Sequence, residues 1–224
     1  MENQNKITLL PSLVSKMFFY LEKIIRKIIF YFSFKNKSYF SDSVRGKHTK
    51  FYESYAISNT CIGDYTYISF NCRISFCEIG KFCSIGPYFR CGLGIHPLKW
   101  ISTHPMFYST LKQNGITLSK NDKIEERKKI IIGNDVFIGA NVTVLDGVTI
   151  WDGAVIWAWA VVSKDIPAYA IAVGCPIVIK GYRFEADVIS KFLKIKWWDF
   201  KPEKLSLIEE HFFDVDKFIN HFYS

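Results

Sequence analysis

The sequence predicts an all-β solenoid, because apolar residues recur every six positions in two separate blocks. In the second block, an aliphatic residue opens each step and another apolar residue takes the fifth place. The steps begin at Ile132, Ile138, Val144, Ile150, Ile156 and Val162, and their fifth residues are Val136, Val142, Val148, Ala154, Ala160 and Ile166. A fixed short period is typical of stacked coils. Neither strand alternation nor the 3.6-residue period of a helix fits as well.

The first block, residues 56–95, keeps this period with one irregularity. Its steps begin at Ile62, Ile68, Ile74, Ile79 and Ile85, so the step from Ile74 has five residues. We interpret the short step as a tightened corner. Period six suits a short strand plus a turn, and three such sides predict a triangular coil of roughly eighteen residues with the aliphatic side chains inside. A β-sandwich with a chance pattern is the alternative.

We expect three domains along the chain: a helical appendage over residues 1–40, a β-helix over 41–181, and a helical segment over 182–224. Residues 41–55 have the composition of a polar lead-in to the first block. Residues 96–129 break the period with prolines and a charged run. They predict a long loop between coils, and such loops usually carry function.

The C-terminal segment changes from the six-residue period to a helical one. An amphipathic run covers Glu185–Ile195 and precedes two adjacent tryptophans. Beyond Pro202, we expect one further helix over Glu203–Phe218.

The composition narrows the partners of the chain. Its net charge of +8 and its pI near 9.1 indicate an anionic partner. Nucleic acid, anionic lipid and a phosphate-rich cofactor all qualify. No nucleic-acid-binding motif accompanies the charge, so we expect no nucleic acid.

The six cysteines predict free thiols in a reducing compartment. None forms a C-x-x-C pair, and Cys72 and Cys83 take the fifth place of their steps, where a small apolar residue is needed. Free cysteine behaves as a small core residue. A metal site or a disulfide is the alternative.

The N-terminal segment predicts a cytoplasmic protein, because it lacks the pattern of a secretory signal. Residues 17–34 are rich in aromatic and aliphatic side chains and are interrupted by Glu22, Lys23, Arg26 and Lys27. These charges argue against a spanning helix. Two interpretations stay open: a basic amphipathic helix lying on the inner face of the membrane, or a helix packed on the solenoid or on a partner subunit.

The loop over residues 96–129 brings two histidines, His96 and His104, to the edge of the solenoid. A histidine there can take the proton of an acceptor hydroxyl near neutral pH, which acyl transfer from a thioester needs. Donors nearby would stabilise the tetrahedral oxyanion. A hydrogen-bonded surface histidine is the alternative.

Three motifs of the chain occur together. The first is His96 followed by Ser-Thr-His-Pro at residues 102–105. The second runs from Asp-Gly-Ala-Val at 152–155 through 162–169 to Gly-Cys-Pro at 174–176. The third is Tyr-Arg-Phe at 182–184 with Trp-Trp-Asp-Phe at 197–200. Over roughly residues 56–205 the chain resembles the hexapeptide-repeat acyltransferases, in particular the xenobiotic acetyltransferase branch, which also contains many sugar O-acetyltransferases.

This resemblance implies a left-handed parallel β-helix, a homotrimer with active sites between neighbouring subunits, and acetyl-CoA as donor. It implies His96 as the general base. His104 stands where the family often has tyrosine and, with Trp100, is a candidate for binding the acceptor.

The resemblance also implies a binding surface for coenzyme A. The family's contacts fall on Ala140, Ala158, Ser163 and Lys164. The two alanines are eighteen residues apart and should stack on successive coils, while Lys164 would meet phosphate as a point charge.

Two departures from the family pattern concern this surface. Val178 stands where the family usually has lysine, so Lys180 is the candidate substitute. The family's usual glycines are replaced by Trp151, Trp157 and Trp159. An indole could stack on adenine or on a sugar, or it could fill a contact between subunits.

The leading hypothesis is an acetyl-CoA-dependent O-acetyltransferase acting on a sugar hydroxyl, of a bacterial surface polysaccharide or its lipid-linked precursor. An antibiotic O-acetyltransferase of the chloramphenicol or streptogramin type is the alternative, and a non-catalytic trimeric scaffold is a third. A metal enzyme of the γ-carbonic-anhydrase kind needs three histidines at one interface. Only His96 and His104 lie near the edge, so we expect no metal.

Overall fold

The computed structural model describes Met17, Tyr20–Ile25 and residues 38–223. The chain divides into two compact units, Met1–Lys37 and Ser38–Ser224. In the first unit the described residues are helical and exposed. The amphipathic helix expected over residues 17–34 therefore lies mostly outside the described residues. Within the described part of the chain, no helix has the length and hydropathy needed to cross a membrane.

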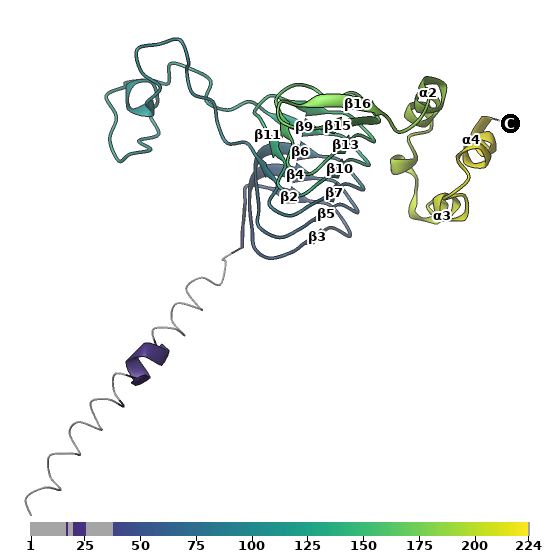
Figure 1. Ribbon diagram of the computed structural model, residues 1–224, viewed down its shortest axis with the longest axis horizontal. Helices are drawn as coiled ribbons and strands as arrows, with labels where there is room; N and C mark the ends of the chain where they lie inside the picture. Colours follow the sequence, from purple (N-terminus) through teal and green to yellow (C-terminus); the bar gives the residue numbers. More distant parts are fainter. Residues whose placement is uncertain (1–16, 18–19, 26–37, 224) are drawn as a thin grey trace, which may run out of the picture. The chain divides into compact units, whose positions relative to one another are not determined.

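The second unit is a left-handed parallel β-helix followed by short helices (Figure 1). Its strands are β1 (Tyr39–Ser41), β2 (Val44–Arg45), β3 (Lys50–Phe51), β4 (Tyr55–Ile62), β5 (Tyr67–Ile68), β6 (Cys72–Ile79), β7 (Ser84–Ile85), β8 (Arg90–Cys91), β9 (Ile130–Ile132), β10 (Phe137–Ile138), β11 (Thr143–Val144), β12 (Thr149–Ile150), β13 (Val155–Ile156), β14 (Val161–Val162), β15 (Ala170–Val173) and β16 (Val178–Tyr182). Its helices are η1 (Pro105–Phe107), α2 (Ala186–Ile195), η2 (Trp197–Asp199), η3 (Pro202–Lys204), α3 (Ser206–Glu210) and α4 (Val215–Tyr223).

The strands stack into three faces of a triangular prism. Face A holds β1, β8, β11, β14 and the first halves of β4 and β6, and face B holds β2, β9, β12 and the second halves of β4 and β6. Face C holds β3, β5, β7, β10, β13 and β15, and β16 closes it by pairing antiparallel with β15. We call the corner between A and B the loop corner, that between B and C the helix corner, and that between C and A the alanine corner.

The register confirms the repeat. In the second block Thr143 pairs with Val161, a step of eighteen residues, whereas in the first block Ile57 pairs with Ile74, a step of seventeen. The missing residue lies at the loop corner, where Phe76 takes a left-handed φ of 52°. The predicted tightened corner is thus confirmed.

The interior consists of the residues that the period predicted. All six step-initial aliphatic residues of the second block and all six fifth-place residues are buried. Cys72, Cys77, Cys83 and Cys91 are buried among them as free thiols. The prediction that Cys72 and Cys83 fill small core positions is confirmed.

The prediction that residues 41–55 are a polar lead-in was wrong, because β1, β2 and β3 already form a coil there. Each pairs in parallel with the next coil. The buried places of this coil are taken by residues such as Thr49, which is polar, and the half-buried Phe51. The aliphatic period is therefore absent although the coil is present.

The C-terminal helices form a second apolar core on the helix corner. Tyr169, Phe192, Trp198, Phe218 and Ile219 are its buried members. The single helix expected over Glu203–Phe218 was wrong, because the chain breaks between α3 and α4. Asp214 accepts a hydrogen bond from the backbone of Lys217 at 2.9 Å and so starts a new helix.

Candidate active site

The long loop leaves the solenoid at the loop corner, where earlier coils only shorten by one residue. It departs after β8 and returns at β9. Gly92 makes the departure possible, because its φ is +67° and a Cβ there would lie 1.9 Å from the carbonyl oxygen of Ser75. Only glycine fits such an approach.

Contacts within the loop fix the ring of His96. Its Nδ1 lies 3.0 Å from the backbone oxygen of Thr103 and 2.8 Å from the hydroxyl of Tyr108. The same hydroxyl donates to the Thr103 oxygen at 3.3 Å. A carbonyl oxygen only accepts, so its contact with His96 favours the tautomer that carries the proton on Nδ1. In the neutral ring, Nε2 then carries a free lone pair on an exposed side chain.

Tyr108 is the buried member of this group. Burial raises the pKa of its phenol, and the charge of Glu126 adds to that rise. The hydroxyl therefore stays protonated and keeps its hydrogen-bonding role at neutral pH. Its ring stands edge-on to the imidazole of His96 at an interplanar angle of 86°.

A cavity of about 450 Å³ lies beside Tyr108. Its walls are mainly apolar, and they include Trp100, an acceptor-binding candidate, and Pro97, which directly follows the catalytic candidate His96. The full lining is Pro97, Trp100, Ile101, Ser102, Phe107, Tyr108, Lys123 and Ile124. A cavity of this size can hold a drug-sized molecule or a sugar.

His104 lies elsewhere in the loop. Its Nδ1 accepts a hydrogen bond from the backbone N–H of Met106 at 3.2 Å and caps η1. It does not line the cavity beside Tyr108. The structure thus gives His104 a role in the loop's backbone, and its contact with an acceptor stays a prediction.

The four candidates for coenzyme A flank face A. Ala140 and Ala158 follow β10 and β13, which pair in register, so they stack at the alanine corner. Ser163 and Lys164 follow β14 at the loop corner and are exposed. Since β8, β11 and β14 are neighbours on face A, this pair lies two coils along from the base of the loop.

The unusual tryptophans are all exposed. Trp157 and Trp159 flank Ala158 at the alanine corner, with 58% and 73% of their surface exposed, while Trp151 lies at the helix corner. Trp157 and Trp159 are therefore beside the coenzyme A candidates, and Trp151 is not. Lys180 is exposed on β16, the last strand of face C.

Sequence reasoning missed two loop residues that contact the histidine, Thr103 and Tyr108. Thr103 contributes only a backbone oxygen, which carries no sequence signal. Tyr108 is one of the chain's 12 tyrosines, and nothing in its spacing from His96 indicates that the two meet.

Two of the buried thiols, Cys72 and Cys83, are poor nucleophiles at neutral pH. Burial raises the pKa of Cys72 to about 11 and that of Cys83 to about 12, so both stay neutral at pH 7. Among the residues that the structure describes, no three His, Cys, Asp or Glu side chains are grouped to hold a metal ion.

Comparison with known proteins gives consistent matches. Residues 129–164 match the family model described as bacterial transferase hexapeptide (six repeats). A chloramphenicol acetyltransferase from Klebsiella aerogenes is 36% identical over 130 residues, which are 57% of this chain and 61% of the relative. This chain thus spans about 61% of the length of that relative.

Two solved structures share the solenoid. A hexapeptide-repeat-containing acetyltransferase from Vibrio cholerae matches with a TM-score of 0.51 and 25% identity, covering 63% of this chain and 74% of that one. A maltose O-acetyltransferase from Clostridium difficile 630 matches with a TM-score of 0.50 and 26% identity, covering 63% and 70%.

Proposed function

We propose that this chain is a bacterial acyltransferase of the hexapeptide-repeat kind. Two matches support this: residues 129–164 fit the hexapeptide transferase model, and a chloramphenicol acetyltransferase is 36% identical over 130 residues. The chain is an acetyl-CoA-dependent O-acetyltransferase with His96 as general base. Its acceptor is a sugar hydroxyl of a bacterial surface polysaccharide or of the lipid-linked precursor. The resemblance to a maltose O-acetyltransferase supports a sugar acceptor.

The observation that carries this proposal is the hydrogen bond between His96 Nδ1 and the Thr103 oxygen. It leaves Nε2 as the basic atom and holds the ring at one orientation. A general base needs both a free lone pair and a fixed position.

The reaction follows from this arrangement. Nε2 of His96 takes the proton of the acceptor hydroxyl as its oxygen attacks the thioester carbonyl of acetyl-CoA. The resulting tetrahedral oxyanion collapses, the C–S bond breaks, and the thiolate of coenzyme A receives the proton from the imidazolium. The products are an acetyl ester and free coenzyme A, with no covalent intermediate on the protein.

The donor surface combines stacked alanines with a basic corner. Ala140 and Ala158 leave backbone groups accessible to the pantetheine amides, and Trp157 or Trp159 stacks on the adenine. Lys164, with Ser163, meets a phosphate, and Lys180 replaces the lysine that the family usually has near Val178.

The site lies between neighbouring subunits of a homotrimer. In this arrangement the loop of one subunit supplies His96 and the adjacent subunit supplies the donor surface. Mixing subunits that carry His96→Ala with subunits that carry Lys164→Glu tests it. When the two variants are mixed in equal amounts, about a quarter of the sites in random trimers would combine an intact His96 from one subunit with an intact Lys164 from its neighbour. No recovery of activity over the unmixed variants would contradict a shared site.

His96→Ala tests the base itself. We expect turnover to fall by about 10²- to 10⁴-fold, with the affinity for acetyl-CoA retained. The assay follows the release of coenzyme A in the presence of acceptor sugars. Turnover like that of the original chain would refute the assignment.

The N-terminal segment supports a lipid-linked acceptor. Residues 17–34 combine basic and aromatic side chains, and the described ones, including Tyr20 and Leu21, are exposed. Removing residues 1–37, which leaves β1 intact, should lower the fraction of the protein that sediments with anionic vesicles. An unchanged fraction would contradict membrane contact.

A second candidate function is acetylation of an antibiotic such as chloramphenicol. The cavity beside Tyr108 has mainly apolar walls, including Trp100, Ile101 and Phe107, and the relative from Klebsiella aerogenes is named a chloramphenicol acetyltransferase. Resistance of cells that express the chain separates the two candidates, since a sugar-specific enzyme confers none.

A further inference from the structure

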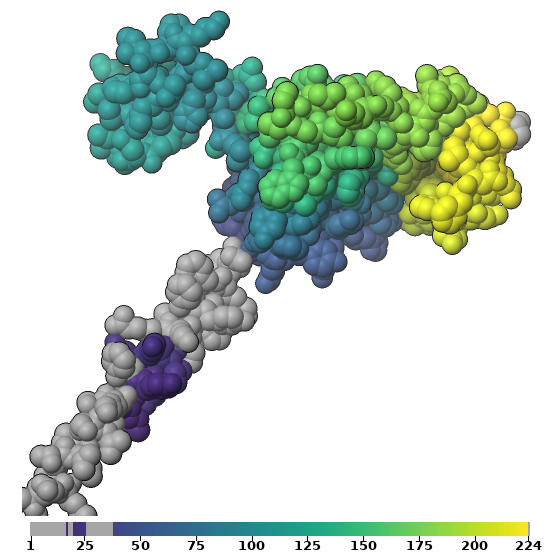
Figure 2. All heavy atoms as spheres, in the orientation of Figure 1, coloured from purple at the N-terminus to yellow at the C-terminus, as the bar shows by residue number. Residues whose placement is uncertain are grey.

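Within the part of the chain that the structure describes, the loop that carries His96 is attached to the solenoid at its stem. Figure 2 shows its atoms as a separate lobe, joined to the coils through a narrow connection. Within the stem, the backbone of Ile95 donates to the oxygen of Glu126 at 2.9 Å, and Arg127 donates to the oxygen of Gly92. These bonds join the two ends of the loop to each other.

One side chain of the next coil bonds both ends of the loop. Asp146 lies at the loop corner between β11 and β12. Its Oδ2 accepts from the backbone N–H of Gly94 at 3.0 Å, and its Oδ1 accepts from that of Lys128 at 3.3 Å. Gly94 lies in the segment that leaves the solenoid after β8, and Lys128 in the segment that returns to β9.

Asp146 can hold the loop in place because its own position in the prism is fixed. It belongs to a coil that pairs with coils on both sides, through β11 with β8 and β14. Gly94 precedes His96 by two residues and has a φ of +97°. Glycine has no side chain to restrict its backbone, so contacts with other residues must hold this conformation. The hydrogen bonds of the Asp146 carboxylate therefore fix the segment that holds His96 to the stacked coils.

We propose that Asp146 is a positioning residue for His96: its carboxylate fixes both ends of the catalytic loop to the solenoid. This inference rests on the proposed function, because it assigns Asp146 to the same reaction. Asp146 itself touches no reacting atom. Displacing a reacting group by about 1 Å can lower a rate by roughly 10²-fold, so loss of the carboxylate is expected to lower turnover substantially.

The main test is a double-mutant cycle. Asp146→Ala should lower kcat by about 10- to 100-fold in the original chain. In the His96→Ala background, the same change should have almost no further effect, because residues that act as a unit are non-additive. Asp146→Asn keeps one acceptor oxygen and should give an intermediate kcat.

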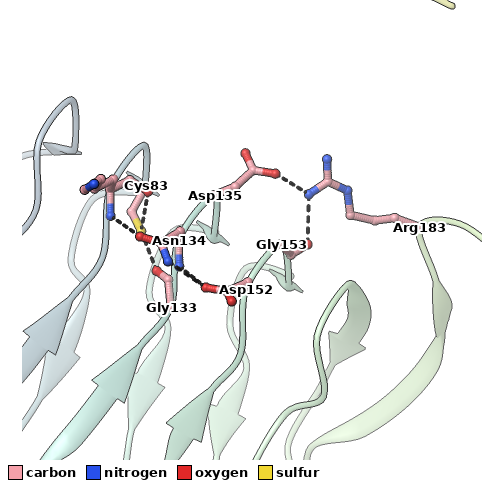
Figure 3. A network of polar contacts seen from close by, with 8 residues as sticks. Cys83, Gly133, Asn134, Asp135, Asp152, Gly153 and Arg183 are labelled. Atoms are coloured by element: carbon pink, nitrogen blue, oxygen red, sulfur yellow. Dashed lines mark hydrogen bonds and ion pairs between the residues drawn. The ribbon is translucent and has the colours of Figure 1, made fainter. Parts of the chain in front are cut away.

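Asp152→Ala is the matched control. Asp152 Oδ1 also accepts two hydrogen bonds from the neighbouring coil, from the backbone and side chain of Asn134 at 2.7 and 2.9 Å, but at the helix corner (Figure 3). Its loss should lower the unfolding temperature while leaving kcat of the folded protein near the original. An equal fall in kcat for both variants would overturn the positioning role.

Hydrogen exchange separates this inference from the proposed function. In Asp146→Ala or Asp146→Asn, the amides of Gly94 and Lys128 should exchange faster, and those of Asn134 should not. Unchanged exchange at Gly94 and Lys128 would overturn the inference whether or not the chain transfers acetyl groups. If exchange rises but no acceptor or donor supports turnover in the original chain, the proposed function fails and the attachment of the loop by Asp146 stands.

Discussion

At the residue scale, the candidate site depends on a single imidazole held by its neighbours. The Thr103 oxygen and the Tyr108 hydroxyl both lie within 3.0 Å of His96 Nδ1. The carbonyl favours the tautomer with the proton on Nδ1, and the phenol restricts the rotation of the ring. Neither neighbour can act as the base, so their effect on catalysis passes through His96.

Tyr108→Phe tests this second contact. The change removes the hydroxyl and keeps the buried ring, so the cavity wall is retained. A hydrogen bond of this kind contributes about 1 kcal/mol, which corresponds to a several-fold fall in kcat. Steady-state kinetics measures it.

Tyr52→Phe is the control for this change, because the Tyr52 side chain is exposed and follows β3 on the first coil, whereas the loop leaves after β8. It should leave kcat unchanged. A Tyr108→Phe variant with full kcat would show that the phenol has no part in orienting the ring.

At the scale of single elements, the corners decide where the loop can leave. Phe76 tightens the loop corner with a φ of 52°, and Gly92 takes the corresponding corner one coil later. At Phe76 the chain makes a five-residue step and continues around the coil, whereas at Gly92 it leaves the coil and enters the long loop. The backbone at Phe76 has room for a Cβ, but the backbone at Gly92 does not.

Gly92→Ala should therefore destabilise the fold strongly. The added Cβ meets the backbone of Ser75 at 1.9 Å, and the left-handed φ adds its own cost. Together we expect a loss of about 2–4 kcal/mol in the free energy of unfolding. Chemical denaturation measures it.

Gly115→Ala separates the two causes. Gly115 has a φ of +92°, but nothing lies within 4 Å of a Cβ placed there. Its substitution should therefore cost only about 1–2 kcal/mol, the backbone part. Equal losses for both variants would contradict the steric explanation.

At the scale of the whole molecule, two ion pairs among the described residues join the C-terminal segment to the prism, Arg183 with Asp135 and Asp199 with Lys81. Arg183 follows β16 and donates to Asp135 Oδ2 at 2.8 Å and to the oxygen of Gly153 at 2.9 Å (Figure 3). Both partners lie at the helix corner. Burial raises the pKa of Asp135, and the guanidinium opposes that rise.

Arg183→Met should destabilise the protein more at pH 7 than at pH 4. Because the folded-state pKa of Asp135 lies above its ordinary value, the folded state binds the proton more tightly than the unfolded state. The free energy of unfolding therefore falls as the pH rises from the ordinary pKa of an aspartate to the higher pKa of Asp135 in the folded state. Without Arg183 that pKa rises further, and an unpaired carboxylate near neutral pH costs about 1–3 kcal/mol. Thermal unfolding at the two pH values measures the difference.

Lys191→Met is the control for the ion pair. Lys191 lies 3.5 Å from Asp187 within α2, and both side chains are largely exposed. Its loss should cost less than about 0.5 kcal/mol at either pH. A pH-independent loss for Arg183→Met would contradict the role of the Asp135 charge.

The sequence by itself determined the solenoid, because every coil buries the same places and the six-residue period records that burial directly. The step-initial aliphatic residues, the five-residue corner at Ile74 and the interrupting loop could all be read from it. The first coil could not, since Thr49 and Phe51 replace the aliphatic period there while backbone pairing maintains the coil. The break between α3 and α4 could not be predicted either, because the helical pattern continues across it and only the capping hydrogen bond of Asp214 marks the start of a new helix.

The sequence also singled out His96, whereas only the tertiary structure decided what holds it. Its partners are a backbone oxygen at Thr103, a phenol at Tyr108 and, through Gly94, a carboxylate at Asp146 on the next coil. A backbone oxygen leaves no trace in a sequence. The contact between Gly94 and Asp146 spans 52 residues and exists only because the coils stack. Periodic burial is a local property that a sequence records, while the geometry of a site depends on contacts that the folded coils create.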